Sequence, residues 1–180
     1  LRLTFCSLAS GGRDINFDMK RVEGYRNFCN KLWNASRFMD LQLENRSASS
    51  TESSQLVDKW ITYKFNRAAS KVEKSFDEYR FDLATQAIYE FVWYEFCDWY
   101  IELTKIRLLD KSVSEEEKSK ILRSVLNILE KALRLAHPIM PFITEEIWQH
   151  HKPHHPDSLE SIMISAFPSI DDNDDEDAYR

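Results

Sequence analysis

The stretch spanning residues 81–109 constrains the fold more than any other part of this chain. It contains no glycine and no proline, and charged residues interrupt it too often for a β-strand, so it is predicted to be a helix. At about 1.5 Å per residue this helix would be roughly 43 Å long, the length of a whole small domain. Apolar residues point almost all the way round it, which predicts burial by neighbouring helices. Acidic residues recur every turn or two, which excludes a membrane span.

The composition of the whole chain favours an all-α fold. Of the 180 residues, 43% are hydrophobic and 13% are aromatic, enough for one sizeable core. Only three glycines and five prolines occur, and no apolar pattern alternates over any length, so a sheet is not expected. We predict an antiparallel helical bundle over residues 1–150, followed over residues 151–180 by a C-terminal extension with an acidic tail.

Helix boundaries follow from apolar spacing and from capping residues. Asp18 or Asn16 can cap the second helix, and Ser114 followed by Glu117 forms a capping-box pattern. Helices are expected at about residues 1–10, 18–41, 55–79, 81–109, 115–137 and 141–148.

Two segments outside these helices have their own signatures. Residues 47–54 are rich in serine and threonine, which predicts a flexible surface loop with no place in the core. Residues 161–167 are predicted to form a short extended piece. Both predictions rest on local composition alone.

The formal net charge of −6 arises mainly at the end of the chain. The sequence holds 30 acidic and 24 basic residues, and residues 171–180 alone contain six acids and one arginine. The rest of the chain therefore has 24 acids against 23 bases and is close to neutral. Its distribution of charge, and not the total, decides which partners it can bind.

Cysteine usage and the start of the chain bear on its origin. Cys6, Cys29 and Cys97 are an odd number without a Cys-x-x-Cys spacing, which favours buried thiols in a reducing compartment over disulfides or a zinc site.

No signal or transit sequence is visible, and a cytoplasmic protein is expected. The chain opens inside a helical pattern without a start methionine, so we expect a piece of a larger protein.

No catalytic or metal site is expected in this chain. Four histidines between His150 and His155 are interrupted by prolines and have no cysteine or acid at ligand spacing among them, so a polar loop is favoured. The sequence has no glycine-rich phosphate loop, no nucleophile elbow and no Glu-x-x-His pair of a di-iron bundle. We therefore assign it no catalytic residue, no metal and no cofactor.

The feature that points to a function is the basic side of two helices. Cations can follow a phosphate backbone, and asparagine amides can read base edges, as in RNA recognition. An ordinary solvated helix surface is the alternative. The central helix holds five acids and no base over residues 81–104 and would repel phosphates. The two basic sides consist of Lys20, Arg26, Asn27 and Lys31 on the second helix and Lys64, Arg67, Lys71 and Lys74 on the third.

Four segments resemble those of a known family. Residues 12–18 (Gly-Arg-Asp-Ile-Asn-Phe-Asp), 26–38 and 91–102 resemble the anticodon-binding domain of valyl-tRNA synthetases, which belong to class I of the aminoacyl-tRNA synthetases. Residues 137–148 are similar to a segment shared by the valine, leucine, isoleucine and methionine enzymes. Together the segments cover most of residues 1–150, and Gly-Arg-Asp-Ile narrows the resemblance to valine.

The resemblance implies a helical bundle that binds the anticodon stem-loop of valine tRNA. In the full enzyme this bundle is joined to an editing domain and to a domain that uses ATP, with magnesium, to attach valine to its tRNA. Neither His-Ile-Gly-His nor Lys-Met-Ser-Lys-Ser occurs here, so catalysis and editing are expected in other parts of the protein. The expected partners are valine tRNA and the rest of the synthetase. A monomer without membrane contact is expected.

Matching to the family places the RNA contacts on the second helix and at its entry. Phe28 could stack on a base, but its position beside the apolar seam equally suits a core role. The alternative function is a helical scaffold that binds a partner protein without RNA, which predicts a large exposed apolar groove and binding insensitive to salt. The candidate RNA-binding residues are Arg13, Lys20, Arg26, Asn27, Phe28 and Lys31.

Overall fold

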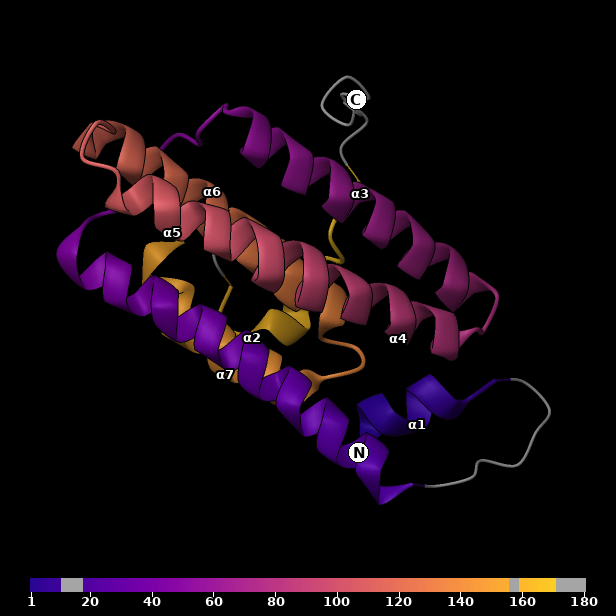
Figure 1. Ribbon diagram of the computed structural model, residues 1–180. Helices are drawn as coiled ribbons and strands as arrows, with labels where there is room; N and C mark the ends of the chain where they lie inside the picture. The colour runs from indigo at the N-terminus through magenta and orange to yellow at the C-terminus, as the bar shows by residue number, and fades with distance from the viewer. Residues whose placement is uncertain (11–17, 156–158, 171–180) are drawn as a thin grey trace.

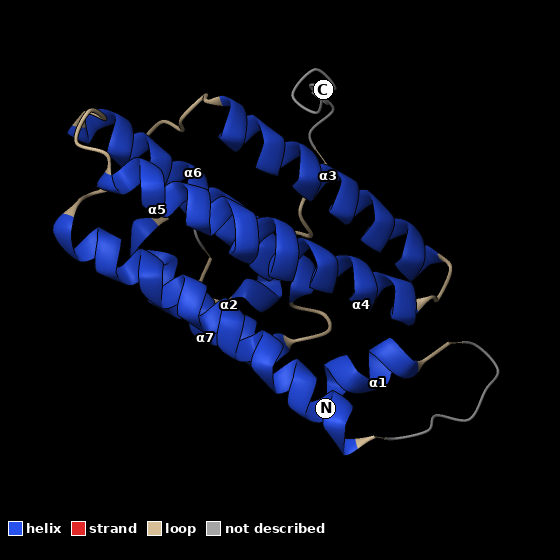
Figure 2. Ribbon diagram, in the orientation of Figure 1, coloured by secondary structure: helices blue, strands red, loops and turns tan. Residues whose placement is uncertain are grey.

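The computed structural model describes residues 1–10, 18–155 and 159–170, and the regular structure in these ranges is entirely helical (Figures 1 and 2). The all-α prediction is therefore confirmed. The main helices are α1 (Arg2–Leu8), α2 (Met19–Asn45), α3 (Leu56–Asp77), α4 (Phe81–Glu90), η1 (Phe91–Tyr100), α5 (Ile101–Leu109), α6 (Glu115–Ala136) and α7 (Pro141–His151). Two short 3₁₀ turns follow, η2 (Lys152–His154) and η3 (Ile162–Ile164).

The long helices pack side by side as a bundle. The run α4–η1–α5 lies between α2 and α3, and α6 packs behind it (Figure 1). Helix α6 contacts α2, α3, α4 and α5, so it is the shared backing of the bundle. The short helices α1 and α7 close the remaining side, α1 against α4 and α7 against α2 and α6.

The central run is one continuous helical rod, as the sequence predicts. Its middle part, η1, is a π-helix of 10 residues. In a π-helix the backbone hydrogen bonds join residues five apart, where an α-helix joins residues four apart. The prediction that neighbours bury this rod almost all round was wrong. Trp99 is 61% exposed and Ile106 is 66% exposed, because α2, α3 and α6 leave one side of the rod facing solvent.

The core contains apolar side chains from all the long helices. Full burial of one such side chain stabilises the fold by about 1.5–3 kcal/mol. The apolar side chains of α6 are all buried, whereas Val22, Tyr25 and Cys29 of α2 are only partly buried. The largest fully buried side chains are Phe28, Leu32, Met39, Ile61, Phe65, Ile88, Phe96, Tyr100, Ile121, Leu122, Leu126 and Leu129.

Helix starts follow the predicted capping chemistry. The Asp18 carboxylate accepts a hydrogen bond from the Lys20 backbone N–H at 2.9 Å, and the Ser114 hydroxyl accepts from the Glu117 N–H at 3.2 Å. Helices α2 and α7 each continue further than predicted, because no breaking residue follows directly on the predicted ends. Tyr79, the last residue of the helix predicted over residues 55–79, lies beyond the end of α3 and is 79% exposed.

The serine-rich loop after α2 lies mostly at the surface, as predicted, but Ser53 differs from the prediction because it is buried against α6. Ser53 is buried, and its N–H donates to the Ser124 hydroxyl at 2.9 Å while its own hydroxyl donates to Glu117 at 2.9 Å. A short serine side chain can both donate and accept a hydrogen bond, so it can pair with polar groups on the surface of a neighbouring helix. Residues 161–167 also differ from prediction, since they contain the turn η3 and not an extended piece.

A buried ion pair joins the start of α3 to α5. The Arg107 guanidinium donates to both carboxylate oxygens of Asp58, at 2.9 and 2.6 Å, and Asp58 is 4% exposed. The Tyr100 hydroxyl donates to the same carboxylate at 2.7 Å, and the Arg107 guanidinium also donates to the Ser53 hydroxyl at 3.2 Å. Burial and the adjacent anion raise the pKa of Tyr100 well above its ordinary value. Three helical elements and one loop meet at this cluster.

Replacing Asp58 with asparagine should destabilise the fold by about 3 kcal/mol, because it leaves the buried Arg107 charge without its counterion. Urea unfolding followed by circular dichroism measures the loss. The matched control is Glu102→Gln, which breaks an exposed pair with Lys105 and should cost less than about 1 kcal/mol. Equal losses in both variants would contradict the assigned role of the cluster.

His150 and His151 form the last turn of α7, which corrects the prediction of a polar loop for these two of the four clustered histidines. His151 ends α7 and is buried, with its Nε2 2.8 Å from the Ser36 hydroxyl and 3.6 Å from Asp40 on α2. His155 lies beside Arg123, and burial together with this cation lowers the pKa of His155 to about 4. Burial also lowers the pKa of His151.

Acidification should destabilise the protein through His155. Its pKa of about 4 lies below the ordinary value of 6.5, so the unfolded chain binds the proton more readily and stability falls as the pH drops from 6.5 toward 4. Urea unfolding at several pH values in this window should show a smaller fall for His155→Gln than for the unchanged chain. His150→Gln, at a half-exposed position, is the control and should keep the full fall.

Candidate RNA-binding surface

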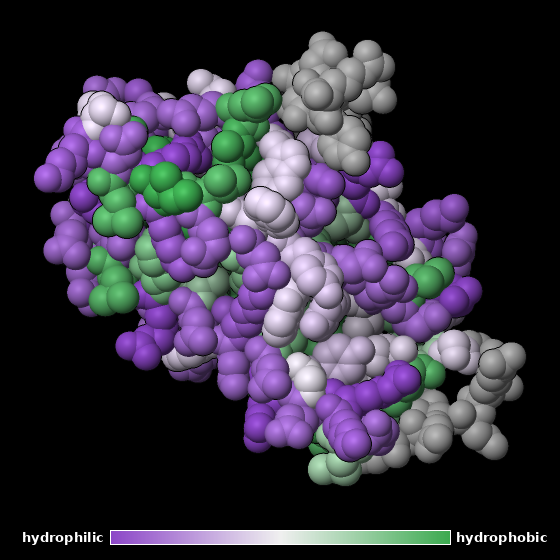
Figure 3. Space-filling model, in the orientation of Figure 1, coloured by the Kyte–Doolittle hydropathy of each residue, from purple (hydrophilic) through white to green (hydrophobic). Residues whose placement is uncertain are grey.

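The outer side of α2 presents a row of cationic and amide side chains to solvent. Arg26 lies at one edge of this row and forms a 3.2 Å pair with Glu23, and both side chains are about two-thirds exposed. A pair of this kind contributes little and leaves the guanidinium accessible. Figure 3 shows the α2 side of the molecule as mostly hydrophilic. We call the exposed row the α2 face: Lys20, Arg26, Asn27, Asn30, Asn34 and Arg37.

The geometry of a helix explains why these side chains gather. Residues three or four apart lie on the same side of a helix, so Asn27, Asn30 and Asn34 form one continuous line. Each amide offers both donors and an acceptor, which suits the edges of unpaired bases. Arginines at the margins can donate to phosphate oxygens with two parallel hydrogen bonds. The face therefore combines cationic groups of the kind that bind a phosphate backbone with amide groups of the kind that bind base edges.

Three members of the α2 face were not among the candidate site residues from the sequence. Asn30, Asn34 and Arg37 are exposed on the same side as Asn27. The signal that finds them is the spacing of three and four residues, which continues the line of Asn27 along the helix.

Lys31 lies at the margin of this face and is already engaged. Its ammonium pairs with the Asp98 carboxylate of η1 and stands 3.9 Å from the centre of the Trp93 ring. The side chain is 24% exposed. Cation–π and ionic contacts together hold Lys31 toward the central rod, so its charge reaches solvent only partly.

The structure removes Phe28 from the RNA-binding candidates. Its side chain is 0% exposed, and its ring stacks on Tyr89 with 4.9 Å between ring centres. Trp93 extends the stack, with 5.4 Å between its ring and that of Tyr89. Because the position falls on the inward side of α2, the core role is correct and base stacking is not. Arg13 lies outside the described residues.

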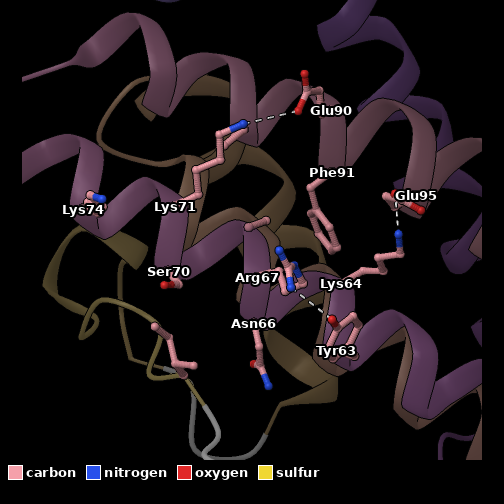
Figure 4. A pocket seen from close by; sticks show the side chains of 13 residues that line it. Tyr63, Lys64, Asn66, Arg67, Ser70, Lys71, Lys74, Glu90, Phe91 and Glu95 are labelled. Atoms are coloured by element: carbon pink, nitrogen blue, oxygen red, sulfur yellow. Dashed lines mark hydrogen bonds and ion pairs between the residues drawn. The ribbon is translucent and has the colours of Figure 1, made fainter. Parts of the chain in front are cut away.

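The basic row on α3 is separate from the α2 face. The central rod lies between the two helices (Figure 1). Lys64 pairs with Glu95 at 3.3 Å and Lys71 with Glu90 at 3.7 Å, so these two lysines neutralise acids of the rod (Figure 4). The two basic rows therefore do not form one continuous surface.

The structure offers no sign of a metal centre in residues 1–10, 18–155 and 159–170. No three side chains of the kinds that bind metals lie together there. No helix of this part is long and apolar enough to cross a membrane.

Cys97 is buried, which raises the pKa of its thiol to about 12 and keeps it protonated near neutral pH.

Comparison with known proteins identifies the family. The family described as the anticodon-binding domain of tRNA ligase matches residues 58–180. The chain belongs to this family. It is 48% identical over 182 residues to the valine–tRNA ligase of Psychrobacter arcticus and 49% identical over 171 residues to that of Acinetobacter baylyi. The resemblance to valyl-tRNA synthetases is thereby confirmed.

The anticodon-binding domain is one part of these relatives. The two alignments cover 96% and 93% of this chain but only 18% of each ligase. The valine–tRNA ligase of Laribacter hongkongensis gives the same result, with 48% identity over 95% of the chain and 19% of the ligase. The chain thus corresponds to about one fifth of a valine–tRNA ligase.

A solved structure shows the same fold. The chain matches LeuRS of Agrobacterium radiobacter K84, crystallised in a ternary complex with tRNA and LeuAMS, with a TM-score of 0.61. The match covers 99% of this chain and 20% of LeuRS at 18% sequence identity. At that identity the comparison supports the helical architecture alone. The prediction of a bundle of the class I synthetase type is confirmed.

Truncating Phe28 to alanine should destabilise the domain by about 3–5 kcal/mol, because a fully buried aromatic ring leaves a cavity in the stack. Asn27→Ala, one position away on the exposed side, is the matched control and should change stability by less than about 0.5 kcal/mol. Thermal and urea unfolding of the two variants measure both values. A small loss for Phe28→Ala would place its ring at the surface and reopen a role in base stacking.

Proposed function

We propose that this domain binds the anticodon stem-loop of valine tRNA through the α2 face. The observation that carries the proposal is the exposed line of Asn27, Asn30 and Asn34 with cations at its margins, on a domain of the anticodon-binding family. Loop bases are unstacked and present their edges, which amide side chains can bind. Lys20, Arg26 and Arg37 are assigned to the phosphates.

Lys31 and Arg13 belong to the proposal in different ways. Lys31 contributes positive charge at the margin of the face, reduced by Asp98. Arg13 precedes α2 in the sequence and is proposed as a further contact near the entry of that helix. Neither is required for the line of amides to read bases.

We also propose the activity of the parent protein. Its relatives are valine–tRNA ligases, and the proposed reaction is attachment of valine to its tRNA at the expense of ATP, with magnesium, followed by editing of misacylated tRNA. These steps belong to parts of the protein outside this chain, which itself binds no cofactor in the proposal. The parent is proposed to be a cytoplasmic monomer whose other domains contact this one.

The proposed recognition is tested with a fluorescently labelled valine anticodon stem-loop. Anisotropy titrations at low and moderate salt compare it with the same stem-loop carrying a swapped anticodon. A preference for the valine anticodon that persists as salt rises is the expected result, because base contacts release few counterions. Equal binding of both RNAs that salt erases would show that the domain contributes only charge. Salt-insensitive capture of a protein without RNA binding would favour the scaffold alternative.

Reversing two charges of the α2 face should weaken stem-loop binding at least about tenfold at low salt. In Arg26→Glu with Arg37→Glu, the slope of log affinity against log salt should fall by about 2, one for each lost phosphate contact. The matched control is Lys111→Glu with Lys120→Glu, which changes the net charge equally but in the turn before α6 and its first turns. Equal losses in the two double variants would mean that net charge, and not the α2 face, governs binding.

Replacing Asn30 and Asn34 with alanine should affect discrimination more than affinity. The expected result is a loss of several-fold preference for the valine anticodon, with an unchanged salt slope, because amides contact bases and not phosphates. The same anisotropy titrations measure this. Unchanged discrimination would exclude these two amides as base readers.

A further inference from the structure

A pocket of about 500 Å³ lies beside the α2 face, between the first turns of α2 and the α4–η1 part of the central rod. Helix α1 packs against both α2 and α4 at this end of the bundle and contributes Ser7 to the lining (Figure 1). Binding clefts for small molecules have volumes of about 300–1,000 Å³, so the pocket is large enough for one planar base. We call it the tyrosine pocket, after Tyr25, Tyr89 and Tyr94, which line it.

The three tyrosines give the pocket aromatic walls. Tyr89 stacks on Phe28 and on Trp93, so the core fixes its position. Tyr25 and Tyr94 each stand edge-on to Tyr89, with 6.2 Å between ring centres in both pairs. Tyr94 is 50% exposed, so its ring is accessible from solvent. Stacking on accessible aromatic rings is a principal contact between proteins and the unpaired bases of RNA.

Gly24 keeps the α2 side of the pocket open. It is exposed, and a Cβ atom at this position would meet no other atom within 4 Å. Gly24 lies three residues before Asn27, on the same side of the helix, so the pocket adjoins the α2 face. Arg21, which also lines the pocket, is exposed and directly follows Lys20 of that face. A nucleotide can therefore place its phosphate beside these two cations and its base in the pocket.

The polar groups of the lining offer acceptors to the edge of a base. The Gln86 amide donates to the Glu90 carboxylate at 2.7 Å, which leaves the Gln86 carbonyl oxygen able to accept. Both acids of the lining have cationic partners, since Glu90 pairs with Lys71 at 3.7 Å and Asp82 with Arg80 at 2.7 Å. A neutral base in the pocket therefore meets acceptors whose negative charges are compensated.

We propose that the tyrosine pocket binds one unstacked base of the RNA and prefers a base with an exocyclic amino group, such as cytosine or adenine. The base stacks on Tyr94 and donates an amino hydrogen to Gln86, while its phosphate stays outside with Arg21. Uracil carries a carbonyl oxygen where cytosine carries the amino group, so two acceptors would meet at Gln86. This inference rests on the proposed binding of RNA by the α2 face and adds a base site that includes the central rod.

Mononucleotides test the pocket without a stem-loop. Cytidine monophosphate, uridine monophosphate and ribose 5-phosphate are each titrated into the chain, and backbone amide NMR shifts are recorded. Cytidine monophosphate should shift Gly24, Gln86 and Tyr94 at several-fold lower concentration than uridine monophosphate, because an unmatched acceptor costs binding energy. Ribose 5-phosphate, which has no base, should shift only Lys20 and Arg21. The absence of base-dependent shifts at the pocket residues would overturn the proposal.

Filling the pocket provides a second test. In Gly24→Trp the new side chain enters open space, so α2 should form as before while cytidine monophosphate no longer shifts Gln86 and Tyr94. The matched control is Glu116→Trp, which adds the same ring at an exposed position in the first turn of α6 and should keep the shifts. Circular dichroism checks that both variants remain helical. Unchanged shifts in Gly24→Trp would contradict the assigned pocket.

Tyr94 connects the pocket to the stem-loop. In anisotropy titrations with the valine anticodon stem-loop, Tyr94→Ala should weaken binding about fivefold or more, whereas Tyr94→Phe should bind as the unchanged chain does, because a phenyl ring still stacks. The salt slope should stay the same, since no phosphate contact is lost.

The outcomes separate this inference from the proposed function. If Tyr94→Ala bound the stem-loop as tightly as the unchanged chain and kept its preference for the valine anticodon, the pocket proposal would fail and recognition by the α2 face would stand. If the unchanged chain bound cytidine monophosphate in the pocket but showed no preference between the two stem-loops, the pocket would stand and the proposed recognition would fail.

Discussion

The arrangement of the bundle depends on the buried pair between Asp58 and Arg107. It joins the first turn of α3 to α5, and the Tyr100 and Ser53 hydroxyls complete its hydrogen bonds. Removing two charges from water is costly, so such a pair persists only where its geometry is bidentate and its remaining groups are satisfied. With this end fixed, the position of α3 along the central rod is set over its whole length.

That alignment has an electrostatic consequence further along the rod. Lysines of α3 fall opposite Glu90 and Glu95, and Lys31 of α2 meets Asp98 on the other side. The rod's acids are therefore compensated from both neighbouring helices. An acidic helix can thus lie in the centre of this domain without repelling phosphates at the proposed RNA-binding surface of α2.

The same domain shows how architecture and recognition are divided. The LeuRS match shares the fold at 18% identity, so many sequences specify this bundle. Its stability comes from apolar packing around α6. Such a core tolerates substitution as long as the total side-chain volume and the order of apolar and polar positions are kept. Recognition is proposed for exposed side chains such as Asn30 and Asn34, which the core does not constrain. Function in this family is therefore argued from surfaces and not from the fold.

The sequence by itself determined the helices, their caps and the family, because periodicity, capping residues and local motifs are properties of neighbouring residues. It also placed Asn27 and Arg26 on the outer side of α2 from spacing alone. Only the tertiary structure decided that Phe28 is buried, that Ser53 and His151 are core groups, and that the two basic rows are separate. Each of these depends on which helix lies opposite, and contacts between residues distant in sequence carry no periodic signal.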